Sequence, residues 1–179
     1  MTVDELTRLA RAAGAGDRYA LASFVRLSHG EVHRLCAALV DRASADDLTQ
    51  DTYLRAIPAL ARFRADSSAR TWLLSITRHT CADAIRKRVR QRALVERLGH
   101  VEPYAHDAHG LADVTDLIDR LDPDRREAFV LTQIAGLSYA DAAEACECPI
   151  GTIRSRVARA RADLVAMTDD TAASDHRTA

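Results

Sequence analysis

Residues 149–161 read PIGTIRSRVARAR and predict the second, longer helix of a helix-turn-helix. Upstream, Ser138-Tyr139-Ala140-Asp141 has the Ser-x-x-acid form of a capping box, which opens a short helix over 139–146. A turn that contains Cys148-Pro149 separates the two predicted helices. In this arrangement the second helix enters the major groove of duplex DNA.

The second helix has two faces at the helical repeat. One side must pack inward and holds Ile153, Val157, Ala160 and Leu164. The outward side holds Thr152, Ser155, Ala158 and Arg159, with Arg154 and Arg156 on its flanks. A helix in a groove meets phosphates at its flanks and base edges at its centre, so Ser155 and Arg159 are the candidates for reading bases. The alternative is a helical hairpin whose arginines are solvated and contact no DNA. The presence of four arginines and no acidic residue over 154–161 disfavours this alternative.

The chain has 179 residues, of which 47% are hydrophobic and 4% aromatic. This length suits one ordinary domain or two small ones with real cores. Apolar residues recur at three- and four-residue spacing, so the predicted fold class is all-α with no sheet. The longest apolar run, 35–40, is too short to span a bilayer, and the N-terminus lacks the features of an export signal. We therefore expect a cytoplasmic protein with no membrane insertion.

Arginine dominates the basic residues: of 25, only Lys87 is lysine, and the formal net charge is −1. Arginine prefers planar partners such as phosphate and guanine edges, which favours nucleic acid, although a GC-rich genome would also enrich it. The cysteines form no C-x-x-C pair and indicate neither a disulfide framework nor a zinc site. We expect most of them to be core thiols, and no cofactor or metal site is predicted.

Breaks in the helical pattern divide the chain into two small helical domains joined by a flexible linker. The first domain is predicted over 1–92 and the second, with the helix-turn-helix, over 114–167. Between them, 93–113 contains glycines, a proline and three histidines that we interpret as solvated, namely His100, His106 and His109. The polar residues 168–179 are expected to form a disordered tail.

Residues 45–60 form a predicted helix with an acidic outer face. Thr49, Thr52, Tyr53, Ala56 and Leu60 gather on one side, and the other side holds Asp47, Gln50, Asp51 and Leu54. An exposed leucine among carboxylates is typical of an anchor for a basic helical partner. A solvated acidic face with one stray leucine is the equally open alternative. Pro58 removes a helical hydrogen bond, so a kink or restart is expected there.

A polar loop at 64–69, with Arg64, Ser67 and Ser68, leads into the next predicted helix. Its buried stripe is expected to be Leu73, Leu74, Ile76, Thr77, Thr80, Cys81, Ala84 and Ile85, and its opposite face to hold Trp72, Ser75, His79, Asp83 and Arg86. The basic run that ends this helix, which includes Arg86, Lys87, Arg88 and Arg90, is a phosphate-sized footprint. Trp72 either stacks on a splayed base or is an ordinary boundary residue.

Together these motifs resemble one family, the extracytoplasmic-function sigma factors, group four of the bacterial sigma-70 superfamily. DDLTQDTYLRA at 46–56 resembles region 2.2, and residues 63–92, with SARTWL at 68–73, resemble regions 2.3 and 2.4. LDPDRREAF at 121–129, LSYADAA at 137–143 and the helix from Pro149 resemble region 4. Within the family the sequence is similar to the actinobacterial sigma C type.

The resemblance implies a promoter-specificity subunit that is not an enzyme. Asp47, Gln50, Asp51 and Leu54 would dock on the β′ coiled coil of core RNA polymerase. The second domain would read the minus-thirty-five element and touch the β-flap, and an anti-sigma factor is a possible further partner. The free protein is expected to be a monomer. The first domain would melt and hold the minus-ten element through Arg64, Ser67, Ser68, Trp72, His79, Asp83, Arg86, Lys87, Arg88 and Arg90.

Two other classes remain in view. A stand-alone helix-turn-helix regulator would bind operator duplex by itself, normally as a dimer on a two-fold site, and it would leave the acidic face unexplained. A pure interaction module of the anti-sigma type would not need the basic recognition helix.

Overall fold

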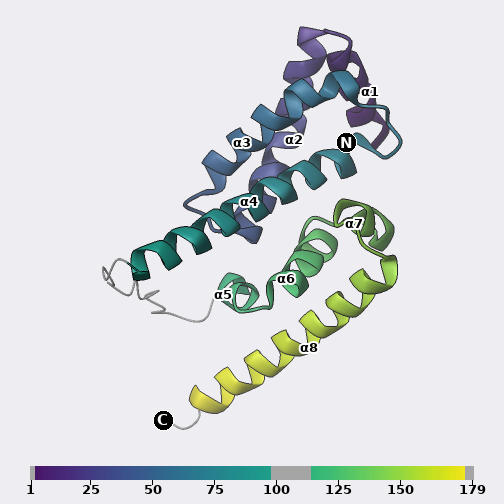
Figure 1. The fold of residues 1–179 in the computed structure, drawn as a ribbon. Coiled ribbons are helices and arrows are strands. Elements are labelled where there is room, and N and C mark those ends of the chain that lie inside the picture. Colours follow the sequence, from purple (N-terminus) through teal and green to yellow (C-terminus); the bar gives the residue numbers. More distant parts are fainter. Residues whose placement is uncertain (1–2, 98–113, 176–179) are drawn as a thin grey trace. The chain divides into compact units, whose positions relative to one another are not determined.

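The computed structural model describes residues 3–97 and 114–175, and every regular element in these ranges is helical. The all-α prediction is therefore confirmed. The described chain forms two compact units, and each is considered by itself (Figure 1). None of the described helices combines the length and apolar character needed to cross a membrane.

The N-terminal unit is a bundle of four helices and one 3-10 turn. Its elements are α1 (Val3–Gly14), α2 (Arg18–Leu39), α3 (Ala45–Ala59), η1 (Leu60–Arg62) and α4 (Ala69–Arg97). Figure 1 shows α2, α3 and α4 running alongside one another, and α1 contacts α2, α4 and η1. Asp17 caps α2, because its carboxylate accepts the amides of Tyr19 and Ala20 at 2.9 and 3.0 Å.

The core of this unit combines large apolar side chains with hydroxyl and thiol groups. The largest fully buried apolar residues are Leu6, Phe24, Val32, Leu35, Leu73 and Leu74. The buried Thr49 and Thr52 of α3 satisfy their hydroxyls on the carbonyls of Ala45 and Leu48, at 2.7 and 2.8 Å. The polar groups therefore enter the core without leaving unpaired donors.

Three of the four cysteines, Cys36, Cys81 and Cys146, are buried and all four are free thiols, so the expectation of core thiols is confirmed. A hydrogen bond with Cys81 lowers the pKa of Cys36, against the opposing effect of burial, and the Thr49 and Thr52 hydroxyls act in the same direction.

The C-terminal unit holds α5 (Val114–Asp119), α6 (Pro123–Phe129), η2 (Val130–Ile134), α7 (Tyr139–Ala145) and α8 (Ile150–Asp175). Asp122 caps α6 and Pro123 occupies its first turn, where a missing amide costs nothing. The π-type turn η2 closes with the Ala135 amide on the Val130 carbonyl at 2.8 Å. Gly136 then adopts a φ of 66°, which a residue without a Cβ tolerates.

Two helices extend beyond their expected ends. α4 continues to Arg97, past the predicted boundary at 92, and α8 continues to Asp175, into the segment expected to be disordered. Neither 93–97 nor 168–175 contains glycine or proline. Lengthening an existing helix is far easier than nucleating a new one, so composition alone was a poor guide to these ends. The rest of the predicted linker, 98–113, and residues 176–179 lie outside the described residues.

Candidate functional site

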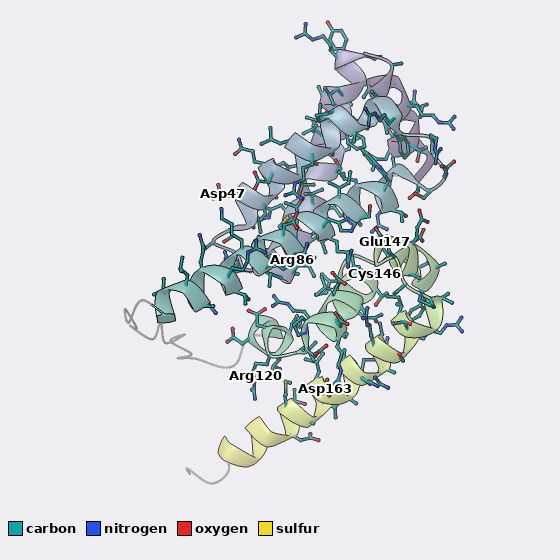
Figure 2. The ribbon with its side chains drawn as sticks, viewed as in Figure 1. Asp47, Arg86, Arg120, Cys146, Glu147 and Asp163 are labelled. Carbon is teal, nitrogen blue, oxygen red and sulfur yellow. The ribbon has the colours of Figure 1, made fainter. Side chains whose placement is uncertain are left out.

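The outer face of α3 is formed by the four predicted residues Asp47, Gln50, Asp51 and Leu54, which are all exposed. Leu54 keeps 64% of its surface exposed, whereas Thr52 and Ala56 on the inner side are fully buried. Figure 2 shows Asp47 on α3. We call these four residues the acidic face.

The acidic face has an apolar extension that the sequence reading did not include. Ile57 is 39% exposed and Pro58 is also exposed, and they follow Leu54 at the i+3 and i+4 positions of the same helix. The same helical spacing that grouped the first four residues could have found both. The result is a short apolar ridge at the end of a carboxylate-rich surface.

Pro58 does not break α3 at its own position. The helix continues to Ala59 and then tightens into η1, where the Leu60 amide bonds to the carbonyls of Ala56 and Ile57. The expected restart therefore occurs just after the proline. Leu54, one turn earlier, keeps a regular helical position.

Ion pairs join α3 to α4 and change the interpretation of Asp83. Its carboxylate accepts Arg55 of α3 at 2.7 Å and Arg86 of α4 at 2.6 Å. Hydrogen bonds from Arg55 and Arg86 lower the pKa of Asp83. A carboxylate shared by two arginines is already satisfied, so the structure favours a role for Asp83 in fixing the two helices over direct reading of DNA.

A second connection involves Arg88, which reaches back to the segment between α2 and α3. Its guanidinium bonds to the Asp41 carboxylate at 2.5 Å and to the Ser44 hydroxyl. Burial alone would raise the pKa of Asp41, but the hydrogen bonds from Arg88 and Ser44 outweigh it and the pKa is lowered.

The basic run at the end of α4 is thereby divided into paired and unpaired members. Arg86 and Arg88 have carboxylate partners. Lys87, Arg90 and Arg92 are exposed and have no ion pair with any residue that the structure describes. The latter three make up the accessible part of the predicted phosphate footprint.

Only part of the stripe of α4 that was predicted to be buried is buried in the structure. Leu73, Leu74, Thr77, Thr80 and Cys81 are buried, whereas Ile76 and Ala84 are half-buried. Ile85 is 38% exposed, so its predicted burial is wrong. Helical periodicity identified the correct face but could not show where the rest of the bundle stops covering it.

The loop between η1 and α4 has a defined conformation. Arg64 pairs with Asp66 at 3.1 Å around Ala65, whose φ is 59°. The Ser68 hydroxyl accepts the Thr71 amide at 3.0 Å and so caps α4.

Two ring-bearing side chains of α4, Trp72 and His79, were predicted to contact the minus-ten element. Trp72 is half-buried and packs on Phe63, with ring centroids 5.1 Å apart at 45°. Trp72 therefore lies at the boundary of the core, and its indole already packs against Phe63. His79 is also half-buried, and its Nε2 lies 3.0 Å from the Arg78 guanidinium.

The helix-turn-helix forms as predicted from the capping box onward. The Ser138 hydroxyl accepts the Asp141 amide at 3.0 Å. At the end of α7 the Cys148 amide bonds to the Ala143 carbonyl at 3.0 Å, and Glu147 between them has a φ of 52°. This is the Schellman arrangement, in which glycine is the usual residue at the left-handed position. Figure 2 labels Glu147 next to Cys146, after α7.

The inward side of α8 is well defined. Ile153, Val157 and Ala160 are buried, and Leu164 is half-buried. On the outward side Arg154, Ala158 and Arg159 are exposed, whereas Thr152 and Ser155 are half-buried. The Ser155 hydroxyl donates to the Thr152 carbonyl at 2.9 Å, so it must leave that bond or share its oxygen to contact a base.

Intramolecular partners distinguish the arginines of α8. Arg156 pairs with Asp124 of α6, and Arg161 donates to the Gln133 side chain at 2.7 Å. Arg154 and Arg159 have no such partner among the residues described. The structure therefore leaves these two guanidinium groups available on the outward face.

One histidine pair on α2 was missed in the sequence. His29 and His33 stand one turn apart, with ring centroids separated by 6.3 Å, and His33 Nε2 lies 3.2 Å from an Asp46 carboxylate oxygen. The i, i+4 spacing was the signal that could have found them. Within 3–97 and 114–175, no three metal-ligating side chains gather as a cluster.

Comparison with known proteins agrees with this two-unit arrangement. The family model for Sigma-70 region 2 matches residues 24–91, and the model for Sigma-70, region 4, matches residues 111–164. An extracytoplasmic-function RNA polymerase sigma factor, SigC of Mycobacterium tuberculosis, is 51% identical over 168 residues, which cover 91% of each chain. The chain is an extracytoplasmic-function sigma factor of the sigma-70 family.

Two solved structures share the fold. CnrH in complex with the cytosolic domain of CnrY has a TM-score of 0.73 and 28% identity, and the match covers 94% of this chain and 99% of that one. RpoE in complex with the anti-sigma factor NepR, from Bartonella quintana, has a TM-score of 0.69 and 31% identity over 83% of this chain and 96% of that one.

The sigma factor described here is thus a non-enzymatic subunit that binds core RNA polymerase and directs transcription initiation. The resemblance noted in the sequence is confirmed.

Proposed function

We propose that this sigma factor binds core RNA polymerase through the acidic face of α3 and recognises promoters with two separate surfaces. The observation that carries the proposal is Leu54, which is 64% exposed between carboxylates on a helix whose other side is fully packed. An exposed apolar anchor inside a charged rim matches a basic helical partner, for which we propose the β′ coiled coil. Ile57 and Pro58 add apolar area to the same contact.

The minus-ten element is assigned to the N-terminal unit. Lys87 and Arg90 supply unpaired charge for phosphates, with Arg86 and Arg88 held nearby by their carboxylate partners. Arg64, Ser67, Ser68, Trp72 and His79 lie on the loop and on the first turns of α4. We propose that these residues hold a base taken out of the stack, with Trp72 available to stack on it.

The minus-thirty-five element is assigned to α8. Arg159 and Arg154 are the unpaired arginines of its outward face, and Thr152, Ser155 and Ala158 complete that face. Arg159 is the base reader in this proposal, because a guanidinium can contact guanine with two hydrogen bonds. Arg156, paired with Asp124, acts at a phosphate only after exchanging that partner.

In this proposal each of the two surfaces binds its promoter element with modest affinity, and the chain between the two units links them. Once both units are fixed on polymerase, each raises the effective concentration of the other at the promoter, with 98–113 as the tether. We propose that the free protein is a cytoplasmic monomer, that the C-terminal unit also touches the β-flap, and that an anti-sigma factor is a possible inhibitor. The sigma factor–inhibitor complexes among the structural relatives support the last point.

Run-off transcription tests the proposal. Core polymerase, the sigma factor and a library of promoter fragments are combined, and Leu54→Glu is compared with Tyr19→Glu. Tyr19 is the matched control, because it belongs to the same unit and is 88% exposed. Wild type and Tyr19→Glu should initiate from the same defined subset of promoters, and Leu54→Glu should not.

Two results would contradict the proposal. If Leu54→Glu retains full activity, the acidic face is not the polymerase contact. If polymerase gains no promoter specificity while the protein alone shifts a two-fold duplex site, the protein acts as a stand-alone helix-turn-helix regulator.

A further inference from the structure

A pair of histidines on α2 borders α3 and has no part in the functions assigned so far. His29 and His33 are one turn apart, and their rings are nearly parallel, with centroids 6.3 Å apart. His29 is exposed and His33 is half-buried. Histidine is the side chain that takes up a proton closest to neutral pH. The histidine pair is therefore a place where the surface charge of the N-terminal unit can change.

Both histidines contact α3. His33 Nε2 lies 3.2 Å from a carboxylate oxygen of Asp46. The ring of His29 is stacked against the ring of Tyr53, with centroids 6.4 Å apart at 6°. Tyr53 directly precedes Leu54, the proposed anchor for polymerase. These contacts place the histidine pair on the side of α2 that meets α3.

The residue that His33 contacts continues the acidic face. Asp46, Gln50 and Leu54 follow one another at four-residue spacing, and side chains at this spacing form a ridge along a helix. Asp46 is the first residue of this ridge, and its side chain is 90% exposed. A partner helix is about 10 Å wide, and α2 packs beside α3 (Figure 1). A helix that packs along the ridge therefore also reaches the histidine pair.

The other charged groups around the histidine pair have separate partners or no partner. Glu31 of α2 is bonded to Arg70 of α4, and Asp41, between α2 and α3, is bonded to Arg88. The remaining titratable or charged groups on the surrounding segments are Arg26 and Arg34 of α2, Arg42 before α3, Asp47, Asp51 and Tyr53 of α3, and Glu5, Arg8 and Arg11 of α1. Within the described residues, Asp46 is the one group that forms an ion pair with either histidine.

We propose that His29 and His33 form a proton-sensitive edge of the polymerase-docking surface. The inference rests on the proposed docking of a basic helix on the acidic face. While both imidazoles are neutral, Asp46 keeps its charge for that partner. A proton on His33 neutralises Asp46, and a proton on His29 adds a further positive charge, so a basic helix is repelled. Docking should therefore weaken as the pH falls through the range in which histidine takes up a proton.

The test measures the affinity of the full-length protein for core polymerase at about pH 7.5 and about pH 5.5, at one low ionic strength. The measured quantity is the ratio of the Kd at the lower pH to the Kd at the higher pH. Polymerase itself contributes to this ratio, so wild type is compared with the double variant His29→Gln/His33→Gln, which takes up no proton at these positions. Circular dichroism at both pH values checks that each protein is folded.

The wild-type ratio should exceed that of the double glutamine variant roughly tenfold, as expected for two like charges added beside a charged contact. The difference should shrink at high salt, because the charges are exposed to solvent.

Two further variants separate charge from shape. His29→Lys/His33→Lys carries the positive charges at every pH of the assay. It should bind more weakly than the double glutamine variant already at about pH 7.5, with the same ratio between the two pH values. Tyr19→His, added to the double glutamine variant, places a titrating group in the first turn of the same helix, where the side chain is 88% exposed. It should leave the ratio of that variant unchanged.

Equal ratios in wild type and the double glutamine variant would overturn the inference. So would a double lysine variant that binds as tightly as the double glutamine variant. Leu54→Glu distinguishes these results from failure of the docking proposal. If Leu54→Glu binds like wild type, the acidic face is not the contact and both proposals fail. If Leu54→Glu loses binding while the ratios are equal, only the role of the histidine pair is overturned.

Discussion

At the residue scale, the arginines of α8 look equivalent in the sequence but differ in whether a carboxylate of the protein pairs with them. Arg159 is exposed without an ion pair among the described residues, whereas Arg156 is bound to Asp124. Arg159→Ala should therefore weaken use of the cognate minus-thirty-five sequence by about 1 to 3 kcal/mol relative to its variants. Competition run-off on promoters that differ only in this element measures the effect.

Arg156→Ala is the matched control for this prediction. Removing the Arg156 guanidinium should reduce run-off from all minus-thirty-five variants by a similar factor, smaller than the effect of Arg159→Ala on the cognate sequence, because the contact proposed for Arg156 is to a phosphate. An equal loss across all variants for Arg159→Ala would contradict its role as a base reader.

Replacing Glu147, which has a left-handed backbone conformation, with glycine should increase the stability of the protein. Its φ of 52° carries a steric cost for any residue with a Cβ, and glycine avoids that cost at a helix C-terminus. Because glycine also loses more chain entropy on folding, Glu147→Gly should raise the free energy of unfolding by roughly 0.5 to 1 kcal/mol. Thermal or urea unfolding followed by circular dichroism gives this value.

The control for Glu147 is Glu144→Gly, which places glycine inside α7. Glu144 is exposed and helical, so this change should lower stability by about 1 kcal/mol. Two glycine substitutions three positions apart should therefore have opposite signs. Equal signs would show that the Schellman arrangement does not determine stability here.

At the scale of the elements, Asp83 connects α3 to α4 and predicts a pH dependence. Its pKa is lowered in the folded state by Arg55 and Arg86, so its contribution to stability is present above the unfolded pKa, near 3.9, and is lost as pH falls through the folded pKa. The Asp83 and Arg55 side chains are each 47% exposed, so the contribution is roughly 0.2 to 1 kcal/mol.

The measurement compares the free energy of unfolding of wild type and Asp83→Asn across pH. The difference should be constant from about pH 6 to 7 and should shrink below about pH 4. Asp66→Asn breaks a far more exposed pair with Arg64 and should show a smaller difference at neutral pH. A difference that grows as pH falls would contradict the assigned coupling.

Much of the element arrangement could be predicted from helical periodicity and caps. The inward residues of α3 and α8 and the capping role of Ser138 follow from spacing and residue type. The pairing of Asp83 with Arg55, of Arg88 with Asp41 and of Arg156 with Asp124 could not be predicted. Each pair joins two different segments across 28 to 47 positions, and no local pattern records which segments become neighbours.

At the scale of the whole molecule, we expect the two proposed DNA-binding surfaces to depend on being in one chain. A specific protease site placed within 98–113 allows the same protein to be assayed before and after cleavage. Cleavage should reduce run-off from a promoter that needs both elements by about 100-fold or more at low protein concentration, because the effective concentration is lost.

Binding of the cleaved N-terminal unit to core polymerase should persist, since the acidic face lies wholly on α3. Raising the concentration of both fragments should restore part of the activity. Unchanged run-off after complete cleavage would show that each unit binds polymerase independently and strongly enough without the other.

The internal ion pairs have a consequence for how the protein responds to ionic strength. A phosphate that replaces Asp41 at Arg88, or Asp124 at Arg156, releases a carboxylate that then gathers cations, so little net counterion release accompanies the exchange. The affinity of this sigma factor for random DNA should therefore fall less steeply with salt than its arginine content suggests. Counterion release supplies most non-specific affinity, so we expect the two paired arginines to lower the binding of this sigma factor to random DNA when polymerase is absent.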